Sequence, residues 1–172
     1  GVYGKQVPLP GMGGLRRRAM EALYHDDHEV RVLHDGETLS LSMLRFSNAN
    51  AAFHASRWRV HPFRENGVVA EDHGLCFDIL MSGKKVVYAP AAAVIHGHER
   101  NWWGEFQFSF ENGFSLDRMG ILGHPRVGGE LKYGLRRIAN DLRYFVSRFR
   151  FLAAFSSTAI SIIKWLGVQC GK

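Results

Sequence analysis

A helix followed closely by a strand constrains the fold of this chain more than any other feature. Apolar residues recur at helical spacing across Glu71–Ser82, and Gly83 stands where a helix ends in a left-handed cap. Lys85–Ala89 is then predicted to form a strand that Pro90 closes, and Ala93–His96 to form a second extended piece. This alternation of helix and strand predicts an α/β fold.

Shorter elements are predicted before this unit. Residues 15–27 carry apolar side chains at helical spacing, and Met43–Phe46 is a strand candidate. Ser47 or Asn48 can cap a helix over residues 49–56, because both side chains accept hydrogen bonds from the free N–H groups of a first turn.

Long helices are predicted towards the C-terminus. Residues 102–114 and 130–151 both repeat apolar side chains at helical spacing; in the first helix these are aromatic and are assigned to packing. Residues 152–170 are apolar but hold four Ser or Thr residues and Lys164. This tail falls short of the roughly 18 to 20 clean apolar residues that cross a bilayer, so an interfacial or packing helix is expected.

The charge of the chain favours an anionic partner. Its formal net charge is +6, and residues 126–150 contain seven basic residues but only two acidic ones. Nucleic acid, acidic lipid and a phosphorylated substrate all fit this excess. The basic face of the predicted 130–151 helix fits attraction to an anionic membrane surface, and it equally fits the solvated face of a packed helix. Cys76 and Cys170 fit no metal or redox spacing, so buried thiols in a reducing cytosol are the simplest interpretation.

The adjacent carboxylates Glu71 and Asp72 are the sharpest candidate for catalysis. They stand at the start of a predicted helix, where free N–H groups and the helix dipole favour an ionised carboxylate. Such a group can accept a proton from an attacking hydroxyl. The alternative is that Asp72 only caps the helix and Glu71 is solvated, and the local sequence favours that alternative.

Other candidate site residues are weaker when each is taken alone. His96 and His98 are two positions apart, so in an extended chain both imidazoles face one side, but a metal site needs further ligands. Asn48 and Asn50 are able to bind sugar hydroxyls, although capping is the commoner role. Two side chains suit stacking on a sugar ring: Trp102 and Trp103.

The order of the motifs is more specific than any one of them. The run contains SNAN at 47–50, ED at 71–72, MSGKKVVYAP at 81–90 and AVIHGH at 93–98. It resembles the second, acceptor-side half of family 2 glycosyltransferases. The opening segment, GVYGKQVP at 1–8, is similar to one found in bacterial rhamnosyltransferases.

The resemblance implies a C-terminal portion of a GT-A fold over residues 1–125, followed by a basic amphipathic helical segment over 126–172. It implies an enzyme that transfers a sugar with inversion of the anomeric configuration. The first donor expected is deoxythymidine diphosphate rhamnose, and the expected acceptor is a glycan or a lipid-linked glycan. Asp72 matches the general base, with Glu71 as its neighbour at the acceptor site. His96 matches a ligand of the metal that holds the donor diphosphate, and His98 is a second candidate.

The family's DxD motif, which binds the divalent ion (Mg²⁺ or Mn²⁺), does not occur in this sequence. The chain is therefore expected to be a truncated enzyme, inactive alone, in preference to a natural remnant. A cytoplasmic location is expected, with peripheral attachment to the inner face of the plasma membrane as an extension. The alternative, from a class of proteins other than enzymes, is a small basic nucleic-acid-binding module. Against it, the basic residues cluster outside 46–98 and no nucleic-acid-binding motif appears in the sequence. No nucleic-acid partner is therefore expected.

Overall fold

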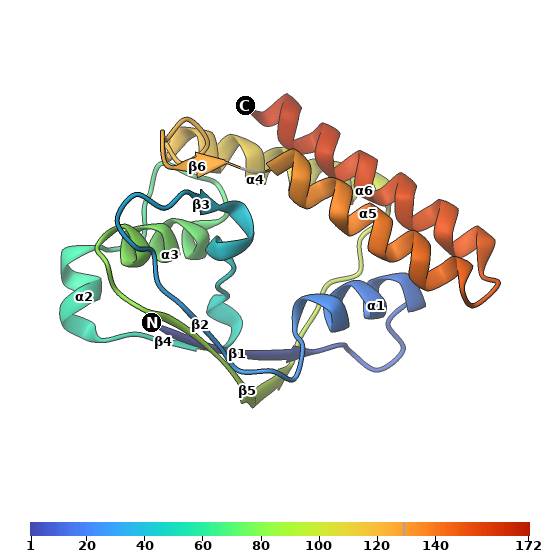
Figure 1. Ribbon diagram of the computed structural model, residues 1–172, viewed down its shortest axis with the longest axis horizontal. Coiled ribbons are helices and arrows are strands. Elements are labelled where there is room, and N and C mark those ends of the chain that lie inside the picture. Colours follow the sequence, from blue (N-terminus) through green and yellow to red (C-terminus); the bar gives the residue numbers. More distant parts are fainter. Residues whose placement is uncertain (129) are drawn as a thin grey trace.

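The computed structural model describes residues 1–128 and 130–172 and has a mixed α/β fold (Figure 1). The strands are β1 (Val2–Val7), β2 (Glu29–Arg31), β3 (Leu39–Ser40), β4 (Ala51–Ala52), β5 (Val86–Ile95) and β6 (Val127–Gly128). Four of them form a sheet in the order β2–β5–β1–β4, in which β1 and β5 are parallel and the outer strands pair antiparallel. Strands β3 and β6 form a separate parallel pair. The α/β expectation is confirmed.

Helices lie on one side of this sheet and extend beyond it (Figure 1). They are α1 (Gly14–Leu23), the 3-10 turns η1 (Leu41–Leu44) and η2 (Asn48–Asn50), α2 (Ala55–Val60), α3 (Glu71–Met81), α4 (Trp102–Arg118), α5 (Glu130–Val146) and α6 (Phe151–Gly171). Helices α4, α5 and α6 pack together as a layer of long helices. Helix α3 lies between the sheet and one end of that layer (Figure 1).

Helix α3 forms the centre of the hydrophobic core, as its apolar periodicity predicts. Leu75, Cys76 and Leu80 are almost completely buried, and they belong to one apolar cluster with Tyr3 of β1 and Tyr88 of β5. The helix ends as expected: Gly83 has a φ of +68° and its N–H donates to the carbonyl of Leu80. Burying this helix fixes the position of its first turn, where Glu71 and Asp72 stand.

The predicted strand over Met43–Phe46 is wrong. Leu41–Leu44 is a 3-10 turn, and the side chain of Leu44 is fully buried. The buried guanidinium of Arg31 donates hydrogen bonds to the carbonyls of Met43 and Arg45. Because a side chain satisfies these carbonyls, the segment needs no neighbouring strand.

The predicted helix over residues 49–56 is also wrong in extent. Ser47 does accept a hydrogen bond from the N–H of Ala49, but the turn it caps ends at Asn50. The chain then extends because Ala51 pairs with Tyr3 of β1. A separate helix, α2, begins at Ala55.

Pro90 does not end a strand, contrary to expectation. Strand β5 continues through it, but its register against β1 shifts, so that Gly4 pairs with Ala89 while Lys5 pairs with Ala93. Residues 90–92 therefore form a bulge, where proline is tolerated because no ladder hydrogen bond is needed from it. Gly4 lies under this bulge: a Cβ there would sit 2.0 Å from the carbonyl oxygen of Ala92.

The predicted helix over residues 130–151 is interrupted. Helix α5 ends at Val146, Phe149 has a left-handed φ of +55°, and α6 begins at Phe151, so the two helices form a hairpin. Helix α6 packs backbone to backbone on α4: a Cβ on Gly167 would lie 2.8 Å from the carbonyl oxygen of Phe106. By length and composition α6 is able to cross a membrane, so the expectation that the tail is too short for this is not confirmed.

Candidate active site

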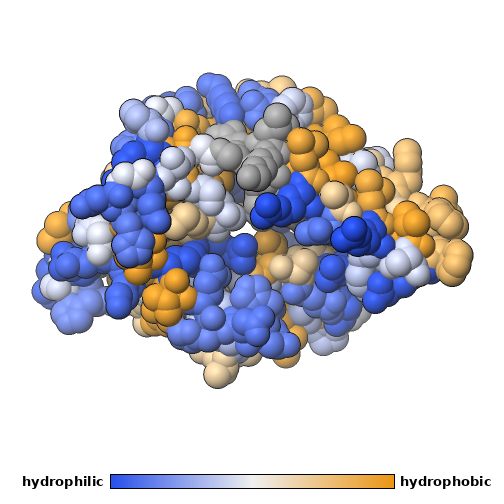
Figure 2. Space-filling model, in the orientation of Figure 1, coloured by the Kyte–Doolittle hydropathy of each residue, from blue (hydrophilic) through white to orange (hydrophobic). Residues whose placement is uncertain are grey.

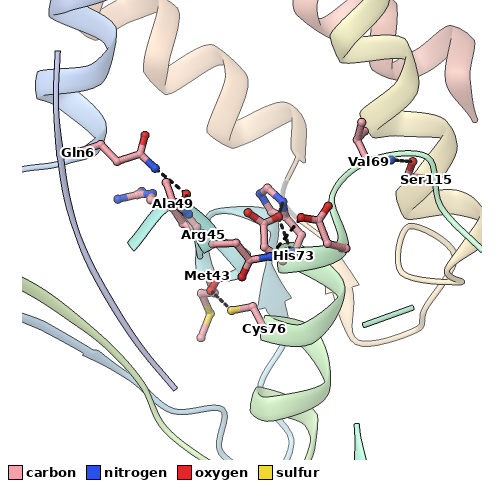
Figure 3. A network of polar contacts seen from close by, with 12 residues as sticks. Gln6, Met43, Arg45, Ala49, Val69, His73, Cys76 and Ser115 are labelled. Atoms are coloured by element: carbon pink, nitrogen blue, oxygen red, sulfur yellow. Dashed lines mark hydrogen bonds and ion pairs between the residues drawn. The ribbon is translucent and has the colours of Figure 1, made fainter. Parts of the chain in front are cut away.

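The loop before α3 holds the backbone in a strained conformation next to the carboxylate pair. Ala70 has a φ of +65°, a left-handed conformation that costs a residue with a Cβ roughly 1–2 kcal/mol. Two hydrogen bonds hold the loop: the N–H groups of Val68 and Val69 donate to the buried Oγ of Ser115 on α4, at 2.9 and 3.0 Å. This arrangement ties the head of α3 to α4, as Figure 3 shows for Val69 and Ser115.

The carboxylate of Asp72 lies largely inside the protein, with 19% of its side chain exposed. Its Oδ1 accepts hydrogen bonds from the backbone N–H of His73, at 2.8 Å, and is 3.0 Å from Nδ1 of the same residue. Burial alone would raise the pKa of Asp72, but the contacts with His73 and with the backbone of Asn48 outweigh it and lower that pKa below its ordinary value. The group is therefore ionised at neutral pH.

Asn48 brings η2 to the first turn of α3. Its side-chain amide donates to Oε1 of Glu71 at 3.1 Å, and its backbone lies beside Asp72. The structure thus joins three residues that the sequence singled out for one site. Glu71 is exposed, so the neighbouring carboxylate is the shielded one of the pair.

Two side chains from distant segments contact Ser47, the residue before Asn48. Gln6 of β1 donates to Oγ of Ser47 at 2.5 Å, and Tyr24, just after α1, also hydrogen-bonds Ser47. Burial raises the pKa of Tyr24 to about 12, so its hydroxyl keeps its proton and can donate. Figure 3 shows Gln6 and Ala49 on one side of His73 and the Val69–Ser115 contact on the other.

Asn50 is used by the fold itself. Its side-chain amide donates to the carbonyl of Ala92 at 2.8 Å and so closes the β5 bulge against β1. Its expected contact with an acceptor sugar stays a prediction.

The two histidines lie at the far end of β5. The rings of His96 and His98 meet edge to face with centroids 4.9 Å apart, so both imidazoles do share one side of the chain. Burial, and then the neighbouring side chains of Arg100, His96 and Arg16, lower the pKa of His98. No group of three or more His, Cys, Asp or Glu side chains able to hold a metal occurs among the described residues. Two imidazoles alone do not fit Mg²⁺, which prefers oxygen ligands in an octahedron.

The tryptophans stand apart from the carboxylates. Trp102 and Trp103 begin α4 and are exposed, and Trp103 stacks on Phe106 with ring centroids 5.5 Å apart. Ser115, which contacts the loop before α3, lies 12 residues further along the same helix. At 1.5 Å per residue this is about 18 Å along the axis. The structure therefore does not bring them to Asp72.

Sequence reasoning missed the roles of Gln6, Tyr24, His73 and Ser115. His73 was adjacent to the candidate base and was detectable as a local hydrogen-bond partner. The other three come from elements that reach the site only through tertiary packing, and no short motif marks them.

The structure thus places a shielded, ionised carboxylate at a loop-to-helix junction of an α/β fold. Two known proteins are similar to the chain along nearly its whole length. The chain is 27% identical to the O-antigen chain rhamnosyltransferase RfbN of Salmonella typhimurium and 25% identical to the O-antigen chain rhamnosyltransferase WbaN of Salmonella anatum, in each case over 99% of this chain. This similarity suggests a glycosyltransferase.

The chain spans about half the length of these curated relatives, 54% of each. No family model matches the chain, and no solved structure matches it.

Proposed function

We propose that this chain is the acceptor-side part of an inverting, family 2 glycosyltransferase with a GT-A fold, inactive alone, and that the whole enzyme transfers rhamnose to a growing glycan. The observation that carries the proposal is Asp72: a shielded carboxylate, kept ionised by His73, at the head of α3 beside Asn48 and Glu71. Similarity to two rhamnosyltransferases over nearly the whole chain supports the sugar. Deoxythymidine diphosphate rhamnose is the first donor to test.

In the proposed reaction an acceptor hydroxyl binds beside Asp72 and attacks the anomeric carbon of the donor. The new glycosidic C–O bond forms as the bond to the diphosphate breaks, and the electron pair leaves with the nucleoside diphosphate. The hydroxyl proton passes to Asp72. Because the pKa of this carboxyl is low, it cannot deprotonate a neutral alcohol beforehand, so proton transfer accompanies bond formation. A single displacement inverts the anomeric configuration.

Side chains around Asp72 have separate duties in this proposal. Glu71, held by Asn48, is exposed and is placed to accept hydrogen bonds from other sugar hydroxyls. Asn50, Trp102 and Trp103 remain expected acceptor contacts at greater distance from the base.

A divalent ion, Mg²⁺ or Mn²⁺, belongs to the proposal only as an ion bound jointly with a DxD motif that this sequence lacks. His96 is the expected histidine ligand and His98 the second candidate. Such an ion offsets charge on the leaving diphosphate when bound. The proton transfer to Asp72 does not depend on it.

The α5–α6 hairpin supports a membrane-facing role, on the cytoplasmic side of the plasma membrane. Phe149 and Leu152, at the turn, are 84% and 86% exposed, and Arg148 and Arg150 are interleaved with them. Figure 2 shows apolar side chains gathered at this end of the molecule. Apolar side chains at headgroup depth, flanked by arginines, suit an anionic bilayer surface.

Helix α6 is proposed to lie on the membrane surface and not across it. Glu105 of α4, 3% exposed, forms ion pairs with Lys164 of α6, at 3.0 Å, and with Arg16 of α1, at 2.5 Å. Pulling α6 away into a bilayer would separate Lys164 from Glu105, which would keep Arg16, and would carry the charge of the lysine into hydrocarbon, where it is costly.

The test uses the full-length protein, a lipid-linked glycan acceptor and the rhamnose donor. Asp72→Asn keeps the shape and an acceptor oxygen for His73 but removes the base, so we expect kcat to fall about 10²- to 10⁴-fold while donor binding persists. Asp117→Asn, at an exposed position of α4, is the matched control and should transfer normally. Near-normal turnover of Asp72→Asn, or retention of anomeric configuration in the product by NMR, would reject the mechanism.

A further inference from the structure

A cavity of about 180 Å³ opens between α1 and α5, close to the candidate active site. Its lining is strongly basic and includes Arg18, Leu23, Arg45, Arg136, Asn140 and Asp141. The volume is well above the roughly 10–15 Å³ that one water needs, so a small polar group fits. Three guanidinium groups against one carboxylate leave the lining with a net positive charge.

The arginines of this cavity form no ion pair with a described carboxylate. Among the side chains that the structure describes, in residues 1–128, 135–136 and 138–172, none lies within ion-pair distance of Arg18, Arg45 or Arg136. The Nε of Arg18 is buried without a hydrogen-bond partner there, and its guanidinium lies 4.0 Å from the centre of the Tyr144 ring. Unpaired cations beside a cavity mark a place where an anion is favoured.

Three residues of the lining are held by contacts with their neighbours. Arg45 donates from Nη1 to the carbonyl of Leu23 at 2.9 Å, which ties it to the end of α1 while leaving other donors free. Tyr144 supports Arg18 from α5. The single acidic residue, Asp141, accepts a hydrogen bond from Ser157 of α6 at 2.8 Å. Its charge is thus partly engaged by α6.

We propose that this cavity binds the phosphate or diphosphate group of the acceptor. Guanidinium groups present paired N–H donors that match phosphate oxygens, and such charge-assisted bonds are about twice as strong as neutral ones. A neutral sugar would leave the net positive charge of three arginines and one aspartate uncompensated. The inference deepens the proposed function, on which it rests, by assigning the acceptor a phosphorylated anchor.

The position of the cavity supports the acceptor as the source of that group. Leu23 lines it, and the next residue, Tyr24, hydrogen-bonds Ser47, which adjoins Asn48 and the Asp72 carboxylate. A phosphate held by Arg45 and Arg136 therefore lies on the α1 side of the base. The same helix, α5, leads at Val146 into the exposed apolar hairpin, so a lipid attached to the phosphate has a nearby surface to occupy.

Binding is measured by calorimetry on the full-length protein without donor, using a short-chain isoprenyl diphosphate, inorganic diphosphate and a nucleoside diphosphate. We expect the isoprenyl diphosphate to bind and Arg136→Gln to weaken it about tenfold. Arg143→Gln, an exposed arginine of α5 outside the cavity, is the matched control and should leave affinity unchanged. Asp141→Asn removes the opposing charge and should strengthen binding.

In transfer assays Arg136→Gln should raise the acceptor KM with kcat unchanged, because it touches no reacting atom. Equal losses in Arg136→Gln and Arg143→Gln, or no binding of any diphosphate, overturn the inference while leaving transfer by Asp72 intact. Preference for the nucleoside diphosphate overturns the assignment to the acceptor. If the protein binds diphosphate but has no transfer activity, the cavity is still an anion-binding site and the proposed function is rejected.

Discussion

Ser115→Ala should loosen the head of α3 although Ser115 never approaches the substrate. Its Oγ accepts hydrogen bonds from the N–H groups of Val68 and Val69, at 2.9 and 3.0 Å, and its side chain is fully buried. Each intramolecular hydrogen bond contributes about 0.5–1.5 kcal/mol, so losing both costs about 1–3 kcal/mol. Because the left-handed Ala70 follows directly, the loop is expected to relax and Asp72 to lose its fixed position.

The measurement is hydrogen exchange by mass spectrometry on the full-length protein, combined with transfer kinetics. A loss of 1.4 kcal/mol corresponds to tenfold faster exchange, so amides in residues 66–74 should exchange roughly tenfold faster or more. The value of kcat should fall with them. Ser109→Ala is the matched control: it also removes the hydroxyl of a buried serine from α4, but one with no hydrogen bond among the described residues. Unchanged exchange at 66–74, or equal effects of both variants, would refute the reasoning.

Two further predictions concern charge and the membrane. The folded pKa of Asp72 is depressed, so its stabilising contribution is complete above its unfolded pKa of about 3.9 and is lost as pH falls through the folded pKa. The free energies of unfolding of wild type and Asp72→Asn, measured with urea, should differ by a constant amount above about pH 5, and this difference should shrink as pH falls through the folded pKa of Asp72. A difference that keeps its neutral value down to about pH 2 contradicts this. Separately, Phe149→Glu with Leu152→Glu should abolish co-flotation with phosphatidylglycerol vesicles. The matched double variant Val60→Glu with Val68→Glu, at exposed apolar positions outside the hairpin, should not. Undiminished flotation of the hairpin variant would exclude the hairpin as the contact surface.

Local signals predicted the elements that are stabilised locally. Helix α3 was predictable because its apolar period, acidic first turn and Gly83 cap all agree. Helix α4 was predictable for the same reason, with Asn101 accepting from the N–H of Gly104 at its start. The aromatic stripe on α4 is less buried than predicted, since Phe110 stays exposed at 38% where α6 passes beside it.

Elements set by distant contacts were not predictable from sequence. The segment Met43–Phe46 turns because Arg31, twelve or more residues away, takes its carbonyls. Pro90 stays inside β5 because Gly4 of β1 leaves room for the bulge. The break between α5 and α6 requires a left-handed backbone conformation at Phe149. Such a conformation is usually predicted from a glycine or asparagine, and neither stands at this position.

The same division runs through the candidate site. Glu71, Asp72 and Asn48 were found because carboxylates at a helix start and amides in a turn have local chemical meaning. Gln6, Tyr24 and Ser115 were not found, because each acts through its position and not through reactivity. Sequence reasoning thus identified the reacting group and missed the residues that surround and hold it.

The remaining alternative is that Asp72 only caps α3. One contact of its carboxylate fits that role, and substitutions can distinguish it from the role of a catalytic base. The N-cap position is Ala70, which has no side chain to accept a hydrogen bond, and Oδ1 of Asp72 does accept from the N–H of His73. An ionised carboxylate has two oxygens and about four acceptor sites, so one oxygen can serve the helix while the other takes a proton. Asp72→Asn retains the first duty and removes the second, whereas Asp72→Ala removes both. If Asp72 is only a helix cap, Asp72→Asn should transfer sugar nearly as well as wild type, and only Asp72→Ala should fail. If Asp72 is the catalytic base, neither variant should transfer sugar. In that case Asp72→Ala should also be less stable than Asp72→Asn at neutral pH.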